Sequence, residues 1–196
     1  MPRSLGGSQT RKSTGCPEDL FQNLRGDYGA SIWAETIDQI HYHVPDCAVE
    51  VLTPDFKGEK ISLLKVFNAN PEIYSHNVEC IERISKNIRM QANWKRSLQV
   101  LNYAVKYGMR TKTSMMVGLG ETFVEVIETM KQVVDTGVKI FTIGQYLQPT
   151  NKHLPVDRYV EENEFIDYEK IGLEMGFEIV KSGSLVRSSY QADECV

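Results

Sequence analysis

From Ala30 onward, short runs of apolar and β-branched residues alternate with longer stretches of helical period, and this alternation restricts the possible folds most. The runs at 113–117 and 139–144 are almost continuously apolar or β-branched, which favours strands that are covered on both faces. Parallel strands need crossover connections, which are usually helical. The sequence therefore predicts one α/β domain with a parallel sheet. Three further strands are expected at 49–53, 73–76 and 177–180.

The expected helices follow from apolar residues at spacings of three and four. In 94–107 and 122–136 these stripes end at Gly108 and Gly137, and glycine suits the left-handed conformation that closes a helix. A doubly wound sheet and an arc of a barrel both agree with this pattern. In either fold, ligands gather at the carboxyl ends of the strands. Three further helices are expected at 30–43, 60–67 and 161–175.

Composition excludes several classes of protein. A chain of 196 residues can bury roughly 70% of its extended surface, which is enough for one sizeable core. It has no run of 18 or more apolar residues, so a membrane span is not expected. With 26 acidic and 22 basic residues it has no basic footprint for nucleic acid.

The cysteines and the N-terminal segment add two expectations. Cys16, Cys47, Cys80 and Cys195 form no CxxC pair, which favours a reducing compartment. Residues 1–26 begin with a stretch rich in Gly, Ser and Thr that has no hydrophobic period, so a disordered tail is expected there. Residues 27–196 are expected to fold.

Polar residues and glycines follow every expected strand, which is typical of a site built from several strand ends. Each group also has a plainer explanation. Gly118 and Gly120 could form only a tight turn before a helix, and Phe123 breaks the GxGxxG phosphate pattern. Asn77 and Glu79 could cap a helix, and His76 could be a hydrogen-bonded structural histidine. Arg187 and its serines could cap the tail. GxSxG is absent, so a serine hydrolase has little support.

Six segments in order nevertheless resemble lipoyl synthase, a family of radical S-adenosylmethionine (SAM) enzymes. The similarity runs from about residue 27 to 193, and GQYLQPT and LVRSSY are its most specific strings. The segments are EVLTPDFKG (50–58), YSHNVE (74–79), TKTSMMVGLGET (111–122), IGQYLQPTNKHLPVDRYV (143–160), GLEMGF (172–177) and SLVRSSYQAD (184–193).

This resemblance implies a partial (β/α) barrel of radical SAM type whose N-terminal strands are missing. It implies sulfur insertion at C6 and C8 of a protein-bound octanoyl chain, with SAM and two 4Fe-4S clusters as cofactors. A cofactor must supply this chemistry because no ordinary acid or base removes such hydrogens. The implied partner is an octanoylated lipoyl-domain protein, either a dehydrogenase E2 subunit or the glycine cleavage H protein.

The resemblance also implies roles for particular residues. Asn77 and Glu79 match a polar pair that contacts the ribose and methionine part of SAM. Arg187 and Ser188 match a tail in which a serine oxygen binds the auxiliary cluster, with Ser189 as the other candidate. The adenine motif of the superfamily is matched by Ser114, Met116, Gly118 and Glu121.

The sequence departs from the family at the cysteines. Neither the CxxxCxxC triad nor the second cysteine triad is present, although clusters need grouped thiolates. The chain therefore resembles the C-terminal part of a lipoyl synthase. We expect it to be inactive alone, with an unpaired strand edge near Val49.

Two alternatives remain: a non-catalytic remnant that binds SAM or a lipoyl domain, and an unrelated α/β enzyme with a phosphate cofactor at VGLGET. The expected compartment is the cytoplasm, with the mitochondrion as the alternative.

Overall fold

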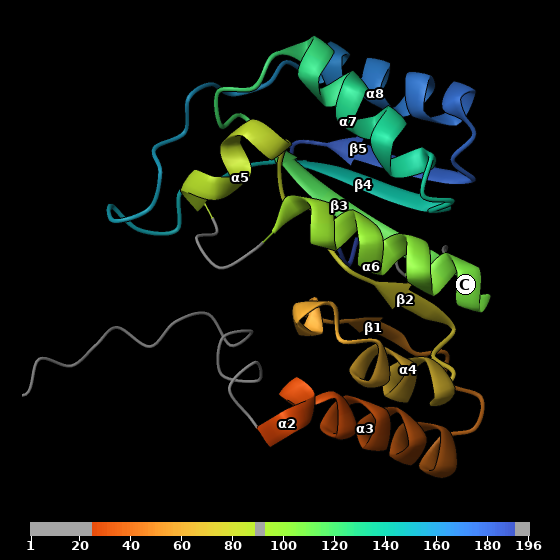
Figure 1. Ribbon diagram of the computed structural model, residues 1–196. Coiled ribbons are helices and arrows are strands. Elements are labelled where there is room, and N and C mark those ends of the chain that lie inside the picture. The colour runs from red at the N-terminus through yellow and green to blue at the C-terminus, as the bar shows by residue number, and fades with distance from the viewer. Residues whose placement is uncertain (1–24, 89–92, 191–196) are drawn as a thin grey trace, which may run out of the picture.

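The computed structural model describes residues 25–88 and 93–190, which form an open, five-stranded parallel sheet with helices packed against it (Figure 1). The spatial order of the strands follows the chain, from β1 at one edge to β5 at the other. The strands are β1 (Glu50–Leu52), β2 (Ile73–Ser75), β3 (Thr111–Val117), β4 (Ile140–Gln145) and β5 (Ile179–Gly183).

The helices precede and connect these strands, and none in the described part of the chain is long and apolar enough to cross a membrane. They are α2 (Arg25–Tyr28), α3 (Ala30–His43), the 3-10 turn η1 (Phe56–Gly58), α4 (Lys60–Asn68), α5 (Glu82–Ile88), α6 (Trp94–Tyr107), α7 (Phe123–Val134) and α8 (Glu162–Met175).

The sequential strand order decides between the two expected architectures. A doubly wound sheet reverses its order at a switch point, whereas here each strand is added on the same side as the one before. Right-handed crossovers that always advance in one direction place every helix on the same face of the sheet. Figure 1 shows α3, α4, α6, α7 and α8 arranged in this way. The fold is therefore an arc of a (β/α) barrel, as the sequence resemblance implied.

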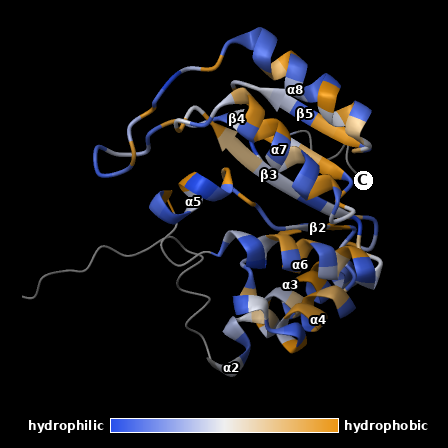
Figure 2. Ribbon diagram, turned by 45° about the horizontal axis from the view of Figure 1, so that its top comes forward, coloured by the Kyte–Doolittle hydropathy of each residue, from blue (hydrophilic) through white to orange (hydrophobic). Residues whose placement is uncertain are grey.

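The two faces of the sheet differ in character. The helix-facing positions, among them Val51, Met115 and Phe141, belong to two hydrophobic clusters together with residues of the helices. Helices α4, α6 and α7 accordingly alternate apolar and polar residues along their ribbons (Figure 2). Because side chains alternate along a strand, the intervening positions point to the opposite side, here called the inner face. Its strand residues are Glu50, Leu52, Ile73, Ser75, Lys112, Ser114, Met116, Ile140, Thr142, Gly144, Ile179, Lys181 and Gly183.

Capping residues explain why the predicted bounds of the helices agree with the structure. Helix α6 begins after Asn93, whose Oδ1 accepts the Arg96 N–H at 3.1 Å, and it ends at Gly108 with φ 98°. Helix α7 begins with a capping box between Thr122 and Glu125. The predicted bounds 30–43 and 94–107 are confirmed, and the predicted helix at 122–136 is shorter, Phe123–Val134.

The predicted strand at 177–180 was displaced. The strand is Ile179–Gly183, because Phe177 belongs to the turn after α8 and stacks on Phe141, with their ring centroids 5.2 Å apart. Helices α2 and α5 and the turn η1 were not predicted. Of the expected tail, residues 25 and 26 begin α2, and residues 1–24 lie outside the described residues.

A buried ion pair crosses the inner face. Lys112 on β3 extends past β2 and donates to Glu50 Oε2 on β1 at 2.8 Å. The lysine side chain is 0% exposed and the glutamate side chain 15%. The pair therefore links the edge strand of the described sheet to its centre.

We expect Lys112→Met to lower the free energy of unfolding by about 3 kcal/mol, because it leaves a partly buried carboxylate without its cation. The double variant Lys112→Met, Glu50→Met removes both charges and should lie within about 1 kcal/mol of the wild type. Urea denaturation measures both values. A single variant as stable as the wild type would show that the ion pair contributes nothing.

Candidate functional site

Four of the predicted site residues meet where β2 and β3 end. The Glu79 N–H donates to the Ser114 carbonyl at 3.0 Å, and the Met116 N–H donates to the Glu79 carbonyl at 2.8 Å. Asn77 precedes this contact on the same segment. The β2–β3 pairing therefore brings Asn77, Glu79, Ser114 and Met116 together where these two strands end.

The inner face carries polar atoms that the described protein does not satisfy. Asn77 is buried, yet its Oδ1 has no hydrogen-bond partner, and the same holds for Ser75 Oγ and Thr142 Oγ1. Buried polar groups are nearly always paired, so an unpaired group needs an explanation such as a ligand or an ordered water. The Asn77 amide is therefore a candidate ligand contact. Neither Asn77 nor Glu79 directly precedes a described helix, since α5 begins at Glu82.

The segment after β5 continues the site toward β4. Met116 is in register with Gly144, and a Cβ on Gly144 would overlap the Val186 carbonyl oxygen. The Arg187 guanidinium lies nearby and donates from Nη1 to that carbonyl at 2.6 Å. Ser188 follows and is half-buried. Gly144, which the sequence analysis did not single out, thus allows the C-terminal segment to cross the inner face.

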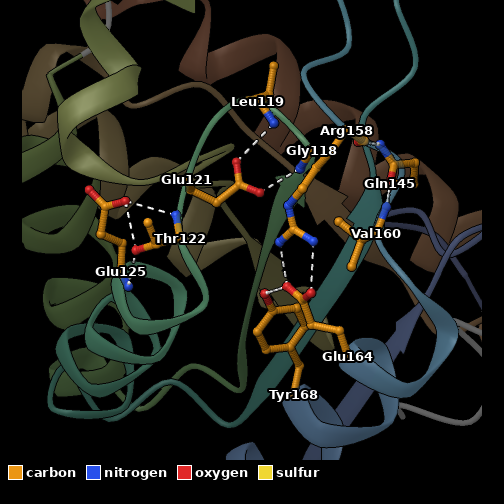
Figure 3. Close-up of polar contacts among 10 residues, drawn as sticks. All are labelled: Gly118, Leu119, Glu121, Thr122, Glu125, Gln145, Arg158, Val160, Glu164 and Tyr168. Carbon is orange, nitrogen blue, oxygen red and sulfur yellow. Dashed lines mark hydrogen bonds and ion pairs between the residues drawn. The ribbon is translucent and has the colours of Figure 1, made fainter.

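Gly118 and Glu121 form a tight turn (Figure 3). The Glu121 carboxylate accepts the N–H groups of Gly118 at 2.6 Å and Leu119 at 2.9 Å. Gly118 has φ 96°, and a Cβ there would overlap the Gln145 amide and lie 2.6 Å from the Arg158 carbonyl oxygen. Contacts within the protein therefore account for the glycine and for the orientation of Glu121. The plainer explanation of VGLGET as a turn before a helix is confirmed, with Thr122 as the N-cap.

Beside this turn, a polar network holds the loop that follows β4. The Gln145 side chain donates to the Arg158 carbonyl at 3.1 Å and accepts the Val160 N–H at 2.9 Å. Arg158 binds both carboxylate oxygens of Glu164, at 2.8 and 2.5 Å, and the Tyr168 hydroxyl also donates to Glu164 (Figure 3). A buried glutamine at the end of a strand was the available sequence signal for this network.

The charges in the network shift its pKa values. The hydrogen bonds from Arg158 hold the pKa of Glu164 below its ordinary value. Burial, and then the hydrogen bond to the Glu164 carboxylate, raises the pKa of the Tyr168 hydroxyl. Glu164 is therefore ionised and Tyr168 protonated at neutral pH, which preserves the ion pair with Arg158 and the hydrogen bond between Tyr168 and Glu164.

His76 and Asp55 support the first two strand ends from the helix side. His76 Nδ1 lies 2.9 Å from the Thr53 carbonyl and Nε2 lies 3.0 Å from Ser97 Oγ, which confirms a hydrogen-bonded structural histidine. Asp55 is buried and accepts from Arg96 Nε at 2.6 Å. Both contacts anchor the ends of β1 and β2 to the start of α6.

The described residues do not provide a metal centre. No group of three or more His, Cys, Asp or Glu side chains within 25–88 and 93–190 is arranged to hold a metal ion. Of the cysteines described there, Cys47 is exposed and Cys80 is buried; Cys16 and Cys195 lie outside those ranges. A four-iron cluster needs several thiolates around one point, so these residues do not fit one.

We expect Gly118→Ala to lower the free energy of unfolding by about 3 kcal/mol, because it combines a left-handed backbone with overlap against Gln145 and Arg158. Gly120→Ala is the matched control: its φ is 97°, but its nearest contact is Asp157 at 3.7 Å, so about 1 kcal/mol is expected. Urea denaturation compares the two. Equal losses would contradict the packing explanation.

Comparison of the sequence with known proteins identifies the family of this chain. Residues 23–133 match the sequence family described as the Radical SAM superfamily. The lipoyl synthase of Rubrobacter xylanophilus is 52% identical over 170 residues, which are 86% of this chain and 53% of that protein. The mitochondrial lipoyl synthase of Nematostella vectensis is 47% identical over 169 residues, 86% of this chain and 58% of that protein. This chain thus spans a little over half the length of these curated relatives.

A structural comparison agrees on the fold. The crystal structure of a methylornithine synthase matches with a TM-score of 0.57 at 12% sequence identity, over 83% of this chain and 56% of that one. This likeness concerns the fold alone. The family match shows that the chain belongs to the radical SAM superfamily, and its sequence is similar to the C-terminal part of a lipoyl synthase.

Proposed function

We propose that residues 27–196 form the SAM-binding part of a lipoyl synthase, which inserts sulfur at C6 and C8 of an octanoyl chain carried by a lipoyl-domain protein. The main observation behind this proposal is that Asn77 is buried where β2 and β3 end, while its Oδ1 has no partner among the described residues. The family match supports it, as do the relatives named lipoyl synthase.

In this proposal the site residues have separate tasks. Asn77 and Glu79 contact the ribose and methionine part of SAM, and Ser114 and Met116 border the adenine. Gly118 and Glu121 act indirectly, because both oxygens of the Glu121 carboxylate already accept backbone N–H groups. They set the turn at the end of β3, and that turn determines how close a ligand can approach this edge.

SAM would supply a carbon radical able to remove hydrogen from an unactivated C–H bond, which no side chain in this site can do. The residues of this chain orient the bound molecule and keep water from it. The inner face suits that task because Thr142 is fully buried and Arg187 lies over Gly144.

The iron–sulfur clusters need ligands beyond the described residues. Ser188, half-buried on the segment that crosses the inner face, could offer one oxygen ligand to an auxiliary cluster. The required sets of cysteines are absent from the sequence. We therefore propose that this chain alone does not cleave SAM and that another polypeptide segment holds the clusters.

The absence of these cysteine sets also favours a second candidate function. In this alternative the chain is a remnant that binds SAM or a lipoyl domain without catalysis. In either case the proposed partner is an octanoylated dehydrogenase E2 subunit or glycine cleavage H protein. The proposed compartment is the cytoplasm, and the mitochondrion is the alternative.

Asn77→Ala should separate binding from stability. Asn77 Oδ1 has no partner among the described residues, so its loss should change the free energy of unfolding by less than about 1 kcal/mol. If that oxygen contacts SAM, the Kd for SAM should rise about tenfold. Isothermal titration calorimetry measures the Kd.

Ser75→Ala is the matched control, since Ser75 Oγ is also buried on the same face without a partner among the described residues, but Ser75 lies two residues before Asn77 and pairs with Lys112. Its Kd should equal that of the wild type. An Asn77→Ala chain that binds SAM as tightly as the wild type would refute the assigned role of Asn77.

Reconstitution tests the catalytic part of the proposal. After anaerobic treatment with ferrous iron and sulfide, the chain alone should form no 5′-deoxyadenosine from SAM, because it lacks grouped thiolates. Turnover by the purified chain would contradict this. Addition of a relative's segment that carries both cysteine triads should restore the product; SAM binding without restoration would favour the non-catalytic remnant.

A further inference from the structure

The end of β2 contains one residue more than the strand beside it. The donors on the β2 side are Tyr74, His76 and then Glu79, whereas their acceptors on β3 are Arg110, Lys112 and Ser114. From His76 to Glu79 the donors advance by three residues, while the acceptors advance by two. The segment Asn77–Val78 is therefore a β-bulge in a parallel ladder.

A bulge leaves one backbone donor without its usual acceptor. Here the donor is the Val78 N–H, since the Ser114 carbonyl accepts from Glu79 instead. The Thr113 hydroxyl takes the place of that carbonyl and accepts the Val78 N–H at 3.2 Å. Thr113 is 0% exposed and Val78 is 2% exposed, so water does not compete for this donor. The side chain of one strand thus stabilises the irregular backbone of the next.

The bulge determines where the candidate ligand contacts point. Asn77 lies within it, and Glu79 directly follows it with φ 68°, in the left-handed region that L-residues rarely adopt. Val78 packs into the helix-facing hydrophobic cluster. With Val78 held on that side by its side chain and by its N–H, Asn77 is directed to the inner face. A regular strand would instead bring Val78 into line with Met115 and Glu79 into line with Met116, whereas the bulge pairs Glu79 with Met115.

We propose that Thr113 is a positioning residue for the SAM site: its hydroxyl holds the Asn77–Val78 bulge in the conformation that presents Asn77 and Glu79 to the ligand. The assignment of SAM as that ligand rests on the function proposed above. Bulges are frequent beside active sites, where they redirect a side chain, and this one lies next to an unpaired buried amide.

Strand β3 offers a matched control for this hydroxyl. Thr111 lies two residues earlier on the same face and is also 0% exposed, but its Oγ1 has no hydrogen-bond partner within residues 25–88 and 93–190. Thr111→Val and Thr113→Val exchange the same buried hydroxyl for the same methyl group. The difference between the two variants therefore isolates the hydrogen bond to Val78, even if both change the unfolding temperature.

The experiment compares the full chain with Thr113→Val, Thr113→Ser and Thr111→Val. Two readouts need no ligand: the hydrogen-exchange rate of the Val78 amide and the side-chain amide resonances of ¹⁵N-labelled asparagine. The third is the Kd for SAM. Thr113→Val should raise the hydrogen-exchange rate of the Val78 amide about tenfold and raise the Kd for SAM about tenfold. It should also shift the side-chain amide resonances of Asn77. Thr113→Ser keeps the hydroxyl and should restore wild-type behaviour, and Thr111→Val should match the wild type.

The positioning role is overturned if Thr113→Val leaves the Asn77 resonances and the Kd unchanged, or if Thr113→Ser is as impaired as Thr113→Val. A wild-type chain that binds no SAM would refute the proposed function instead. In that case, the Val78 exchange rate and the Asn77 resonances still decide whether Thr113 holds the bulge.

Discussion

The hydrogen-bonded register between β2, β3 and β4 is the constraint on which the rest of this structure depends. Parallel pairing in chain order brings the carboxyl ends of neighbouring strands to one edge. It also places α3, α4, α6, α7 and α8 on one side of the sheet, so these helices leave the inner face uncovered (Figure 1). Asn77, Ser114 and Met116 come together for this reason, although Asn77 and Ser114 lie 37 positions apart along the chain. A shift of one residue in either pairing would separate them.

Much of the fold follows from local signals in the sequence. Helices α3 and α6 were predicted with their observed bounds, because an apolar stripe marks each and Gly108 closes the second. The strand order was not predictable in this way, since a doubly wound sheet and a barrel arc contain the same alternation of elements. The C-terminal strand was misplaced because Phe177 has the character of a strand residue but stacks on Phe141 outside the strand. Helix α5, with seven residues, was too short to show a period.

The candidate site was predictable in part. The resemblance to lipoyl synthases selected Asn77, Glu79, Ser114 and Met116, and the pairing of β2 with β3 brings these four together. Their ligand contacts stay a prediction. Three contacts were not predictable from the sequence. The Glu121 carboxylate accepts backbone N–H groups, and Gly144 leaves room for the Val186 carbonyl. The Thr113 hydroxyl accepts the Val78 N–H. Each of these contacts joins separate parts of the fold, and a bulge becomes visible only when both paired strands are known.

The described residues therefore combine unpaired buried polar atoms on the inner face with no set of thiolates for a cluster. The central claim is that the ends of β2 and β3 bind SAM without the help of a cluster in this chain. An anaerobic co-crystal structure with SAM tests it most directly. The account predicts the adenosyl group against Ser114 and Met116, with a ribose hydroxyl donating to Asn77 Oδ1. A ligand bound elsewhere, with Asn77 Oδ1 satisfied by a side chain of the protein itself, would contradict it.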